Sequence, residues 1–200
     1  MTLKIDYFFG IGSPWAYVGV DAFADLAARY DAQVTPFVIP LIPENGGIYS
    51  RDRPAARRAY WTTDLKRWAH LRGVPLNFNG RDKLSDASPA GDLIVAAWLD
   101  GQDWLTLARA LHQAFWGRAE DIGQPAVRQA IADAAGFDGA ALERLAGSDA
   151  VAARRAESLK VAVEAGVFGL PTYRVGDALF WGQDSLPFLE RHLKGETLVD

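Results

Sequence analysis

The two ends of this chain carry β-strand patterns, and the long stretch between them is helical. Residues 3–9, "LKIDYFF", place Ile5, Tyr7 and Phe9 on one face and Phe8 on the other, as in a strand buried on both faces. Residues 33–39, "QVTPFVI", predict a second strand, at a sheet edge or bulge because of its proline. A helical pattern separates the two strands. The chain therefore begins with a predicted βαβ unit.

Strand patterns return only after residue 166. The segments "PTYRV" at 171–175 and "ALFW" at 178–181 flank a Gly-Asp turn pair and predict a β-hairpin, and "DSLPFLERHLKG" predicts a closing amphipathic helix. Neither terminal unit has enough strands to bury both faces of a sheet alone. We therefore expect the βαβ and ββα units to meet in one sheet.

The middle of the chain predicts an insertion into this α/β fold. A loop rich in proline and glycine covers residues 40–54, and helical patterns then continue to residue 165. We predict one domain from residues 1–40 and 166–200 and an all-helical domain from residues 41–165. Half of the 200 residues are apolar and 12% are aromatic, which is enough for a well-packed core. A site is expected in the cleft between the two domains.

The composition argues against several classes of function. The net charge is −4 and the basic residues are scattered, which argues against nucleic-acid binding. No long apolar run and no cleavable signal pattern occur, so we expect a soluble cytoplasmic protein without membrane contact. His70, His112 and His192 lack the spacing of metal ligands, and no metal site is expected. The absence of cysteine excludes disulfides and cysteine nucleophiles, so any sulfur chemistry needs sulfur from another molecule.

The stretch "GIGSPWAYVG", residues 10–19, is the predicted turn from the first strand into the first helix. Pro14 suits the first helical position, and Ser13 suits the N-cap. The same geometry favours an anion, because free N–H groups, the helix dipole and a hydroxyl meet there. These two interpretations are compatible. A dinucleotide-binding fingerprint is disfavoured because the third glycine is missing.

Three motifs in order, "YFFGIGSPWAYVG", "GVFGLPTYRV" and "LFWGQDSLPFLE", resemble the 2-hydroxychromene-2-carboxylate isomerases. These enzymes are relatives of kappa-class glutathione transferases in the DsbA-like thioredoxin superfamily. The resemblance covers essentially the whole chain and implies a thioredoxin-like fold, glutathione as cofactor and a homodimer. Redox members carry Cys-x-x-Cys where this chain has Ser13-Pro14-Trp15-Ala16. A dithiol oxidoreductase is therefore excluded.

The resemblance also implies which residues bind glutathione. Ser13 would hydrogen-bond the cofactor's sulfur and lower its pKa, with Pro14 and Trp15 beside it. Leu170 and Pro171 resemble a cis-proline loop, in which the Leu170 backbone pairs with the tripeptide like an added strand. An ordinary turn into the hairpin is the alternative interpretation.

A second group would hold the ends of the tripeptide. Gly182, Gln183, Asp184 and Ser185 would bind the γ-glutamyl end, with the Asp184 carboxylate on its ammonium group. A plain helix cap is the alternative for Asp184. In the loop before the inserted helices, Asn45 and Arg57, or Arg58 in its place, would contact glutathione or the substrate carboxylate. A solvated helix face is the alternative for these arginines.

The resemblance implies a glutathione-dependent isomerase that converts 2-hydroxychromene-2-carboxylate-type aromatic acids into trans-o-hydroxybenzylidenepyruvate-type products by reversible thiolate addition. Phe8, Trp15 and Trp61 are expected to wall the flat substrate, although core packing explains most of the seven tryptophans. Two alternatives stay open. One is a kappa-like glutathione transferase or peroxidase acting on another substrate. The other is a non-catalytic thioredoxin-like binding protein, which the joint presence of Ser13, Pro171 and the Gln183-Asp184 pair disfavours.

Overall fold

The computed structural model describes residues 3–199, so residues 1–2 and 200 of the predicted domain ends lie outside the described residues. Its four-stranded mixed sheet has the order β2-β1-β3-β4. The strands are β1 (Lys4–Phe9), β2 (Gln33–Val38), β3 (Thr172–Val175) and β4 (Ala178–Trp181). β1 is parallel to β2 and antiparallel to β3, which in turn is antiparallel to β4. The two ends of the chain thus form one sheet as predicted, and Pro36 lies in an edge strand.

The helices follow the predicted patterns closely. They are α1 (Pro14–Arg29), α2 (Ala55–Arg72), α3 (Ser88–Leu99), α4 (Trp104–His112), α5 (Pro125–Ala134), α6 (Gly139–Ala146), α7 (Asp149–Glu164) and α8 (Leu186–Leu193). After α4 the helical pattern changes to a π-helical turn, η4 (Gln113–Gly117). A short 3₁₀ turn, η5 (Gln183–Ser185), precedes α8.

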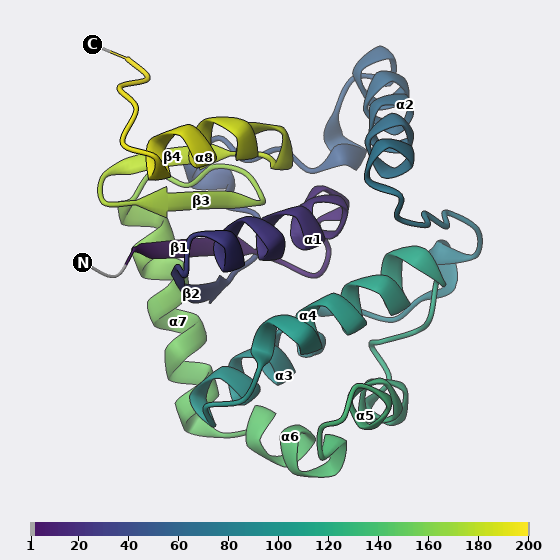
Figure 1. Ribbon diagram of the computed structural model, residues 1–200. Coiled ribbons are helices and arrows are strands. Elements are labelled where there is room, and N and C mark those ends of the chain that lie inside the picture. The colour runs from purple at the N-terminus through teal and green to yellow at the C-terminus, as the bar shows by residue number, and fades with distance from the viewer. Residues whose placement is uncertain (1–2, 200) are drawn as a thin grey trace.

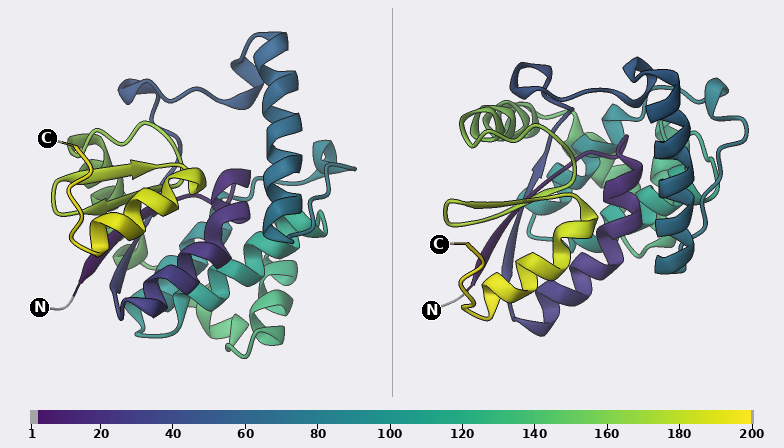
Figure 2. Two further views of the ribbon diagram at one scale, coloured as in Figure 1. Left: turned by 45° about the horizontal axis from the view of Figure 1, so that its top comes forward. Right: turned by 90° about the horizontal axis from the view of Figure 1, so that it is seen from above.

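Helices cover both faces of the sheet (Figures 1 and 2). α1 and α8 lie on one face and α7 on the other, as the view from above shows. The alternation along β1 explains this arrangement. Tyr7 and Phe9 stack with ring centroids 4.4 Å apart in the large core on the α1 side, whereas Phe8 packs against Phe37 at 4.7 Å on the α7 side. β1 is therefore buried on both faces, as its sequence predicts.

Several helices of the helical segment contact the sheet: α7 and α3 pack against β2, and α4 packs on Phe9 of β1. α2 projects along the edge of the molecule and buries Leu65 and Ala69, with much of its remaining surface exposed (Figure 1). α7 lies in the predicted helical insertion yet packs against β2, and Arg154 donates to the Pro36 carbonyl at 3.0 Å. The boundary at residue 165 therefore stays a prediction.

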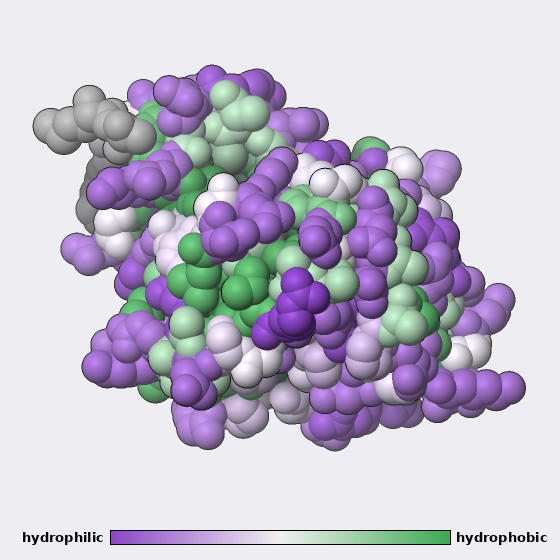
Figure 3. Space-filling model, turned by 90° about the horizontal axis from the view of Figure 1, so that it is seen from below, coloured by the Kyte–Doolittle hydropathy of each residue, from purple (hydrophilic) through white to green (hydrophobic). Residues whose placement is uncertain are grey.

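The surface of the helical end is mixed in polarity. Seen from below, on the side of α5 and α6, polar side chains surround an apolar area near the middle of the face (Figure 3). No helix within residues 3–199 is both long and apolar enough to span a membrane.

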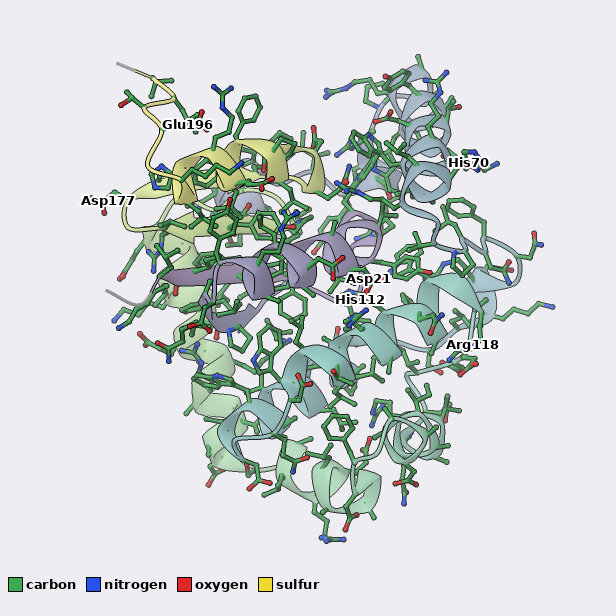
Figure 4. All side chains as sticks on the ribbon, in the orientation of Figure 1. Asp21, His70, His112, Arg118, Asp177 and Glu196 are labelled. Carbon is green, nitrogen blue, oxygen red and sulfur yellow. The ribbon has the colours of Figure 1, made fainter. Side chains whose placement is uncertain are left out.

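His112, the last residue of α4, is a buried titratable group beneath the start of α1. It is fully buried, and its ring lies 6.0 Å from that of Phe9 and 6.3 Å from that of Tyr17. Asp21 lies near it between α1 and α4, whereas His70 points outward from α2 (Figure 4). Burial lowers the pKa of His112 to about 4, and the Gly10 backbone and the Asp21 carboxylate oppose only part of this shift. The imidazole is therefore neutral at pH 7.

We predict that His112 makes the protein less stable in mild acid. The unfolded chain gains a proton near pH 6.5 that folded His112 takes up only near pH 4, so the free energy of unfolding falls between these values. The full effect is about 3 kcal/mol. Urea unfolding at pH 7, 5.5 and 4 measures it. His112→Leu should flatten this dependence, whereas His70→Leu, at an exposed position, should keep it. If the free energy of unfolding of His112→Leu depended on pH as steeply as that of the wild type, His112 would not be the group responsible.

Candidate active site

A large cavity opens where the ends of β1 and β2 meet the start of α1. Its volume is about 1000 Å³. Its wall is formed by the turn Gly10–Ser13, one face of α2, the loop that follows β2 and residues 168–170, together with Trp181, Gly182 and Asp184. This volume is at the upper end for small-molecule sites. The cavity thus brings together the three sequence motifs, which lie far apart along the chain.

Ser13 caps α1 and faces the Leu170 loop. Its Oγ accepts a hydrogen bond from the Ala16 N–H at 3.2 Å and donates one to the Leu170 carbonyl at 3.0 Å. No acidic side chain occupies the first turn of α1, so the positive end of the helix dipole is not neutralised there. The predicted N-cap is confirmed. The hydroxyl and the helix terminus form a wall that favours negative charge.

The Leu170 loop is fixed from both sides. The Leu170–Pro171 peptide is cis, and the Gly182 N–H donates to the Pro171 carbonyl at 2.8 Å. The Thr172 hydroxyl donates to the Gly169 carbonyl at 2.7 Å. Leu170 lines the cavity, whereas Pro171 is buried behind it. The predicted cis-proline loop is therefore present, and the ordinary turn is excluded.

Residues 182–185 form a tight turn that presents one carboxylate. Gly182 has φ +88°, and a Cβ there would lie 2.4 Å from the Asp184 Oδ1 atom, so glycine is required. Asp184 is exposed and lines the cavity. The Ser185 hydroxyl donates to the Gly182 carbonyl at 2.8 Å and shapes the turn without lining the cavity.

Gln183 is held by an arginine that the sequence analysis missed. Its side chain is 1% exposed, and Oε1 accepts hydrogen bonds from Arg72 Nε at 3.2 Å and Nη2 at 3.1 Å. Arg72 Nη2 also donates to the Gln183 carbonyl at 3.4 Å. Gln183 therefore does not line the cavity. It joins the end of α2 to the turn that carries Asp184.

The cavity wall from α2 is aromatic and cationic. Trp61 packs edge-on against Trp15 of α1, with ring centroids 6.4 Å apart, and Arg57 lines the cavity as an exposed side chain. Pro14 lies in the same wall. Arg58 instead donates to the Arg51 carbonyl at 3.4 Å. Of the two arginines considered, the structure brings Arg57 to the cavity.

Sequence reasoning missed other wall residues, among them two arginines and a tryptophan. Arg53 reaches the wall from just before α2, and Trp181 comes from the end of β4. Arg155 donates from α7 to the Val38 carbonyl at 2.8 Å, and Gly91 leaves room for it, since a Cβ there would lie 2.8 Å from Arg155 Nη1. For Trp181, the only signal in the sequence is that it precedes Gly182 of the third motif. For Arg53 and Arg155 the sequence gives no such signal.

Two predicted wall residues lie elsewhere. The Asn45 side-chain amide donates to the Val163 carbonyl at 3.1 Å and the Val167 carbonyl at 3.0 Å, so it ties its loop to the end of α7 instead of lining the cavity. Phe8 is fully buried on the α7 face of the sheet, because it alternates with the residues that face α1. Neither side chain reaches the cavity.

Comparison with known proteins agrees with this geometry. Residues 4–194 match the DSBA-like thioredoxin domain family. The 2-hydroxychromene-2-carboxylate isomerase of Sphingobium xenophagum is 31% identical, over 96% of this chain and 99% of the relative. The chain belongs to this isomerase family within the DSBA-like thioredoxin fold. The predicted fold class is thereby confirmed, and the chain is classed with enzymes rather than with binding proteins.

A solved structure and a second relative support the assignment. The structure of a 2-hydroxychromene-2-carboxylate isomerase superposes with a TM-score of 0.79 at 27% identity, covering 96% of this chain and 95% of the other. Human glutathione S-transferase kappa 1 is 28% identical, over 96% of this chain and 91% of its own.

We predict that Arg72 stabilises the folded enzyme through Gln183. Replacing Arg72 by Met leaves the buried Gln183 oxygens without these donors and should lower the free energy of unfolding by about 2 kcal/mol. Arg67→Met is the matched control, because Arg67 lies on an exposed part of the same helix and should change little. Equal urea midpoints for Arg72→Met and the wild type would show that the pair contributes nothing.

Proposed function

We propose that this enzyme binds glutathione in the cavity and uses it to isomerise 2-hydroxychromene-2-carboxylate-type aromatic acids to the open-chain benzylidenepyruvate form. Two relatives support the proposal by name. One is the isomerase that is 31% identical, and the other is the human kappa-class glutathione transferase. The arrangement of the cavity residues in this chain is the second line of support for both the reaction and the cofactor.

The cavity residues fit the chemistry of glutathione. Leu170 lies in the cavity wall beside Ser13, where its backbone can pair with an extended tripeptide in the manner of strand addition. Asp184 offers an exposed carboxylate for the α-ammonium group. Arg57 supplies a cation for a terminal carboxylate, and the dipole of α1 suits a thiolate. The ammonium group and one carboxylate of the tripeptide thus each have a partner of opposite sign.

Ser13 activates the thiol in this proposal. A cysteine thiol has a pKa of about 8.5 in water and is mostly protonated at neutral pH. The Ser13 hydroxyl and the N-terminus of α1 stabilise the anion and lower this pKa. When bound, glutathione supplies a nucleophilic thiolate that adds reversibly to the conjugated substrate and leaves unchanged. Pro14 begins the helix without an N–H of its own, and the Ala16 N–H donates to the Ser13 hydroxyl.

The aromatic wall orients the substrate. Trp15 and Trp61 form an edge-to-face pair beside Ser13, and such a corner accepts a flat conjugated ring. Arg53, just before α2, adds a further positive charge to the cavity wall, which suits the substrate's carboxylate. Charge and shape therefore select a planar aromatic acid.

The observation that carries the proposal is the position of the Ser13 hydroxyl, 3.0 Å from the Leu170 carbonyl at the wall of the cavity. Titration calorimetry with glutathione tests it directly. Binding in the millimolar range or tighter is expected, with S-methylglutathione as a comparison that keeps the charged ends. If neither glutathione nor S-methylglutathione gave binding heat at millimolar concentration, the isomerase and the glutathione transferase would both be excluded.

We predict that Ser13→Ala raises the pKa of the bound glutathione thiol. A hydrogen bond to a charged group contributes about 1.5–3 kcal/mol, which corresponds to about one to two pKa units. Ultraviolet absorbance of the thiolate against pH, with the protein saturated by glutathione, measures the shift. Ser148→Ala is the matched control, since Ser148 caps α7 in the same way but lies outside the cavity wall. Identical titrations for Ser13→Ala and the wild type would exclude this role.

We also predict that glutathione is recovered unconsumed after many turnovers. Reversible addition returns the thiol, so the free-thiol content should stay constant while a hydroxychromene carboxylate is converted. Thiol titration and chromatography of the same reaction mixture provide the measurement. One conjugate formed for each substrate lost would instead favour a kappa-like transferase, and oxidised glutathione would favour a peroxidase.

A further inference from the structure

The turn that carries Ser13 is held from behind by a residue of the helical segment. Ile11 is buried in this turn, and its carbonyl accepts a hydrogen bond from the Trp116 indole Nε1 at 2.9 Å. The bond is buried and joins residues 105 positions apart. Within the turn itself, the Ser13 N–H donates to the Gly10 carbonyl at 2.9 Å. The turn is thus fixed both internally and by Trp116.

Trp116 is itself firmly placed. It lies in the π-helical turn η4, which ends beside Arg118 (Figure 4), and it is 7% exposed. The Arg81 guanidinium lies over its ring, 3.7 Å from the centroid, and donates to the Phe115 carbonyl. The Asn77 N–H donates to the Trp116 carbonyl at 2.8 Å. A π turn inserts an extra residue into a helix and redirects the side chains that follow, and such turns occur often at functional sites.

The Trp116 bond sets the direction of a second backbone group. In a planar trans peptide the carbonyl of Ile11 and the N–H of Gly12 point in opposite directions. Because the carbonyl points at Trp116, the Gly12 N–H points away from it, and Gly12 is exposed at the wall of the cavity. Among residues 3–199, no acceptor hydrogen-bonds this N–H. A donor one residue before Ser13 is therefore held in a fixed direction.

We propose that Trp116 is a positioning residue, whose indole N–H fixes the Gly10–Ser13 turn so that the Ser13 hydroxyl and the Gly12 N–H are aligned for the glutathione thiolate. This inference rests on the proposed function. The energetic argument is preorganisation: donors that are already oriented stabilise an anion without a further ordering cost. A misplacement of a fraction of an ångström weakens both donors at once. The helical segment thereby takes part in sulfur activation without contacting the sulfur.

Trp116→Phe is the first test, because phenylalanine keeps an aromatic ring beneath Arg81 and removes the indole donor together with one ring of the bicycle. The pKa of bound glutathione is expected to rise by about half a unit to one unit, and kcat/KM to fall roughly tenfold at pH 7, with little change in the glutathione Kd. Trp104→Phe is the matched control. Trp104 is 8% exposed and packs on Phe9 at 6.0 Å, but among residues 3–199 its indole donates no hydrogen bond. It should leave the thiol pKa unchanged.

A second measurement needs no bound cofactor. Hydrogen exchange of the Ser13 amide, which donates to the Gly10 carbonyl within the turn, should accelerate in the free Trp116→Phe enzyme and stay unchanged in Trp104→Phe. If Trp116→Phe fails to fold, β-(3-benzothienyl)alanine placed at position 116 keeps the ring shape and replaces the N–H by sulfur. The thiol pKa and the exchange rates are then read on that variant.

The outcomes separate this inference from the proposed function. If the wild type binds no glutathione, the proposed function fails, and with it the role in thiol activation. If the wild type and Ser13→Ala behave as proposed but the Trp116 variants keep the wild-type thiol pKa, only the positioning role is overturned. A fall in melting temperature without a change in the thiol pKa would likewise reduce Trp116 to a structural residue.

Discussion

The structure depends on β1, which is paired along both edges and buried on both faces. β1 pairs with β2 from its own terminal unit and with β3 from the other end of the chain. Because the turn Gly10–Ser13 leaves directly from the end of β1, the position of Ser13 depends on the packing of that strand. The Leu170 loop enters β3 at the same end, so two segments 157 residues apart meet as one wall. The pairing that completes the sheet thus also assembles the site.

Much of this fold could be predicted from the sequence because its signals are local. The two-residue alternation of 3–9 gives a strand buried on both sides, Pro36 gives an edge position, and Ser13-Pro14 gives a helix start. Each of these signals depends only on residues that are close together in the sequence. Ser13 was found for the same reason, as a helix cap before Pro14. Leu170 and Asp184 were instead found through the resemblance of their motifs to the isomerase family.

The residues that local patterns missed act across the fold. Arg72 reaches Gln183 over 111 positions and Trp116 reaches Ile11 over 105 positions, and neither pairing leaves a periodic trace. Asn45 shows the opposite error. It is a polar residue in a loop of the right length, but its two amide hydrogens are used by the end of α7. Spacing could not distinguish these cases, because each of these residue types occurs both in structural contacts and in sites.

The bond between Ser13 and Leu170 has a consequence for how a thiolate would bind. A hydroxyl has one proton to donate, so Ser13 cannot serve the Leu170 carbonyl and a sulfur atom fully at the same time. An extended tripeptide lying along Leu170 brings a backbone N–H of its own, which can replace the hydroxyl on that carbonyl. Under the proposed function, backbone pairing and thiol activation are therefore one coupled exchange: the donor lost by Leu170 is returned by the ligand. A small thiol without a peptide backbone offers no such exchange, because the hydroxyl then leaves a carbonyl unpaired. Under the proposed function, selectivity for a peptide thiol would thus follow from the same hydrogen bond that positions Ser13.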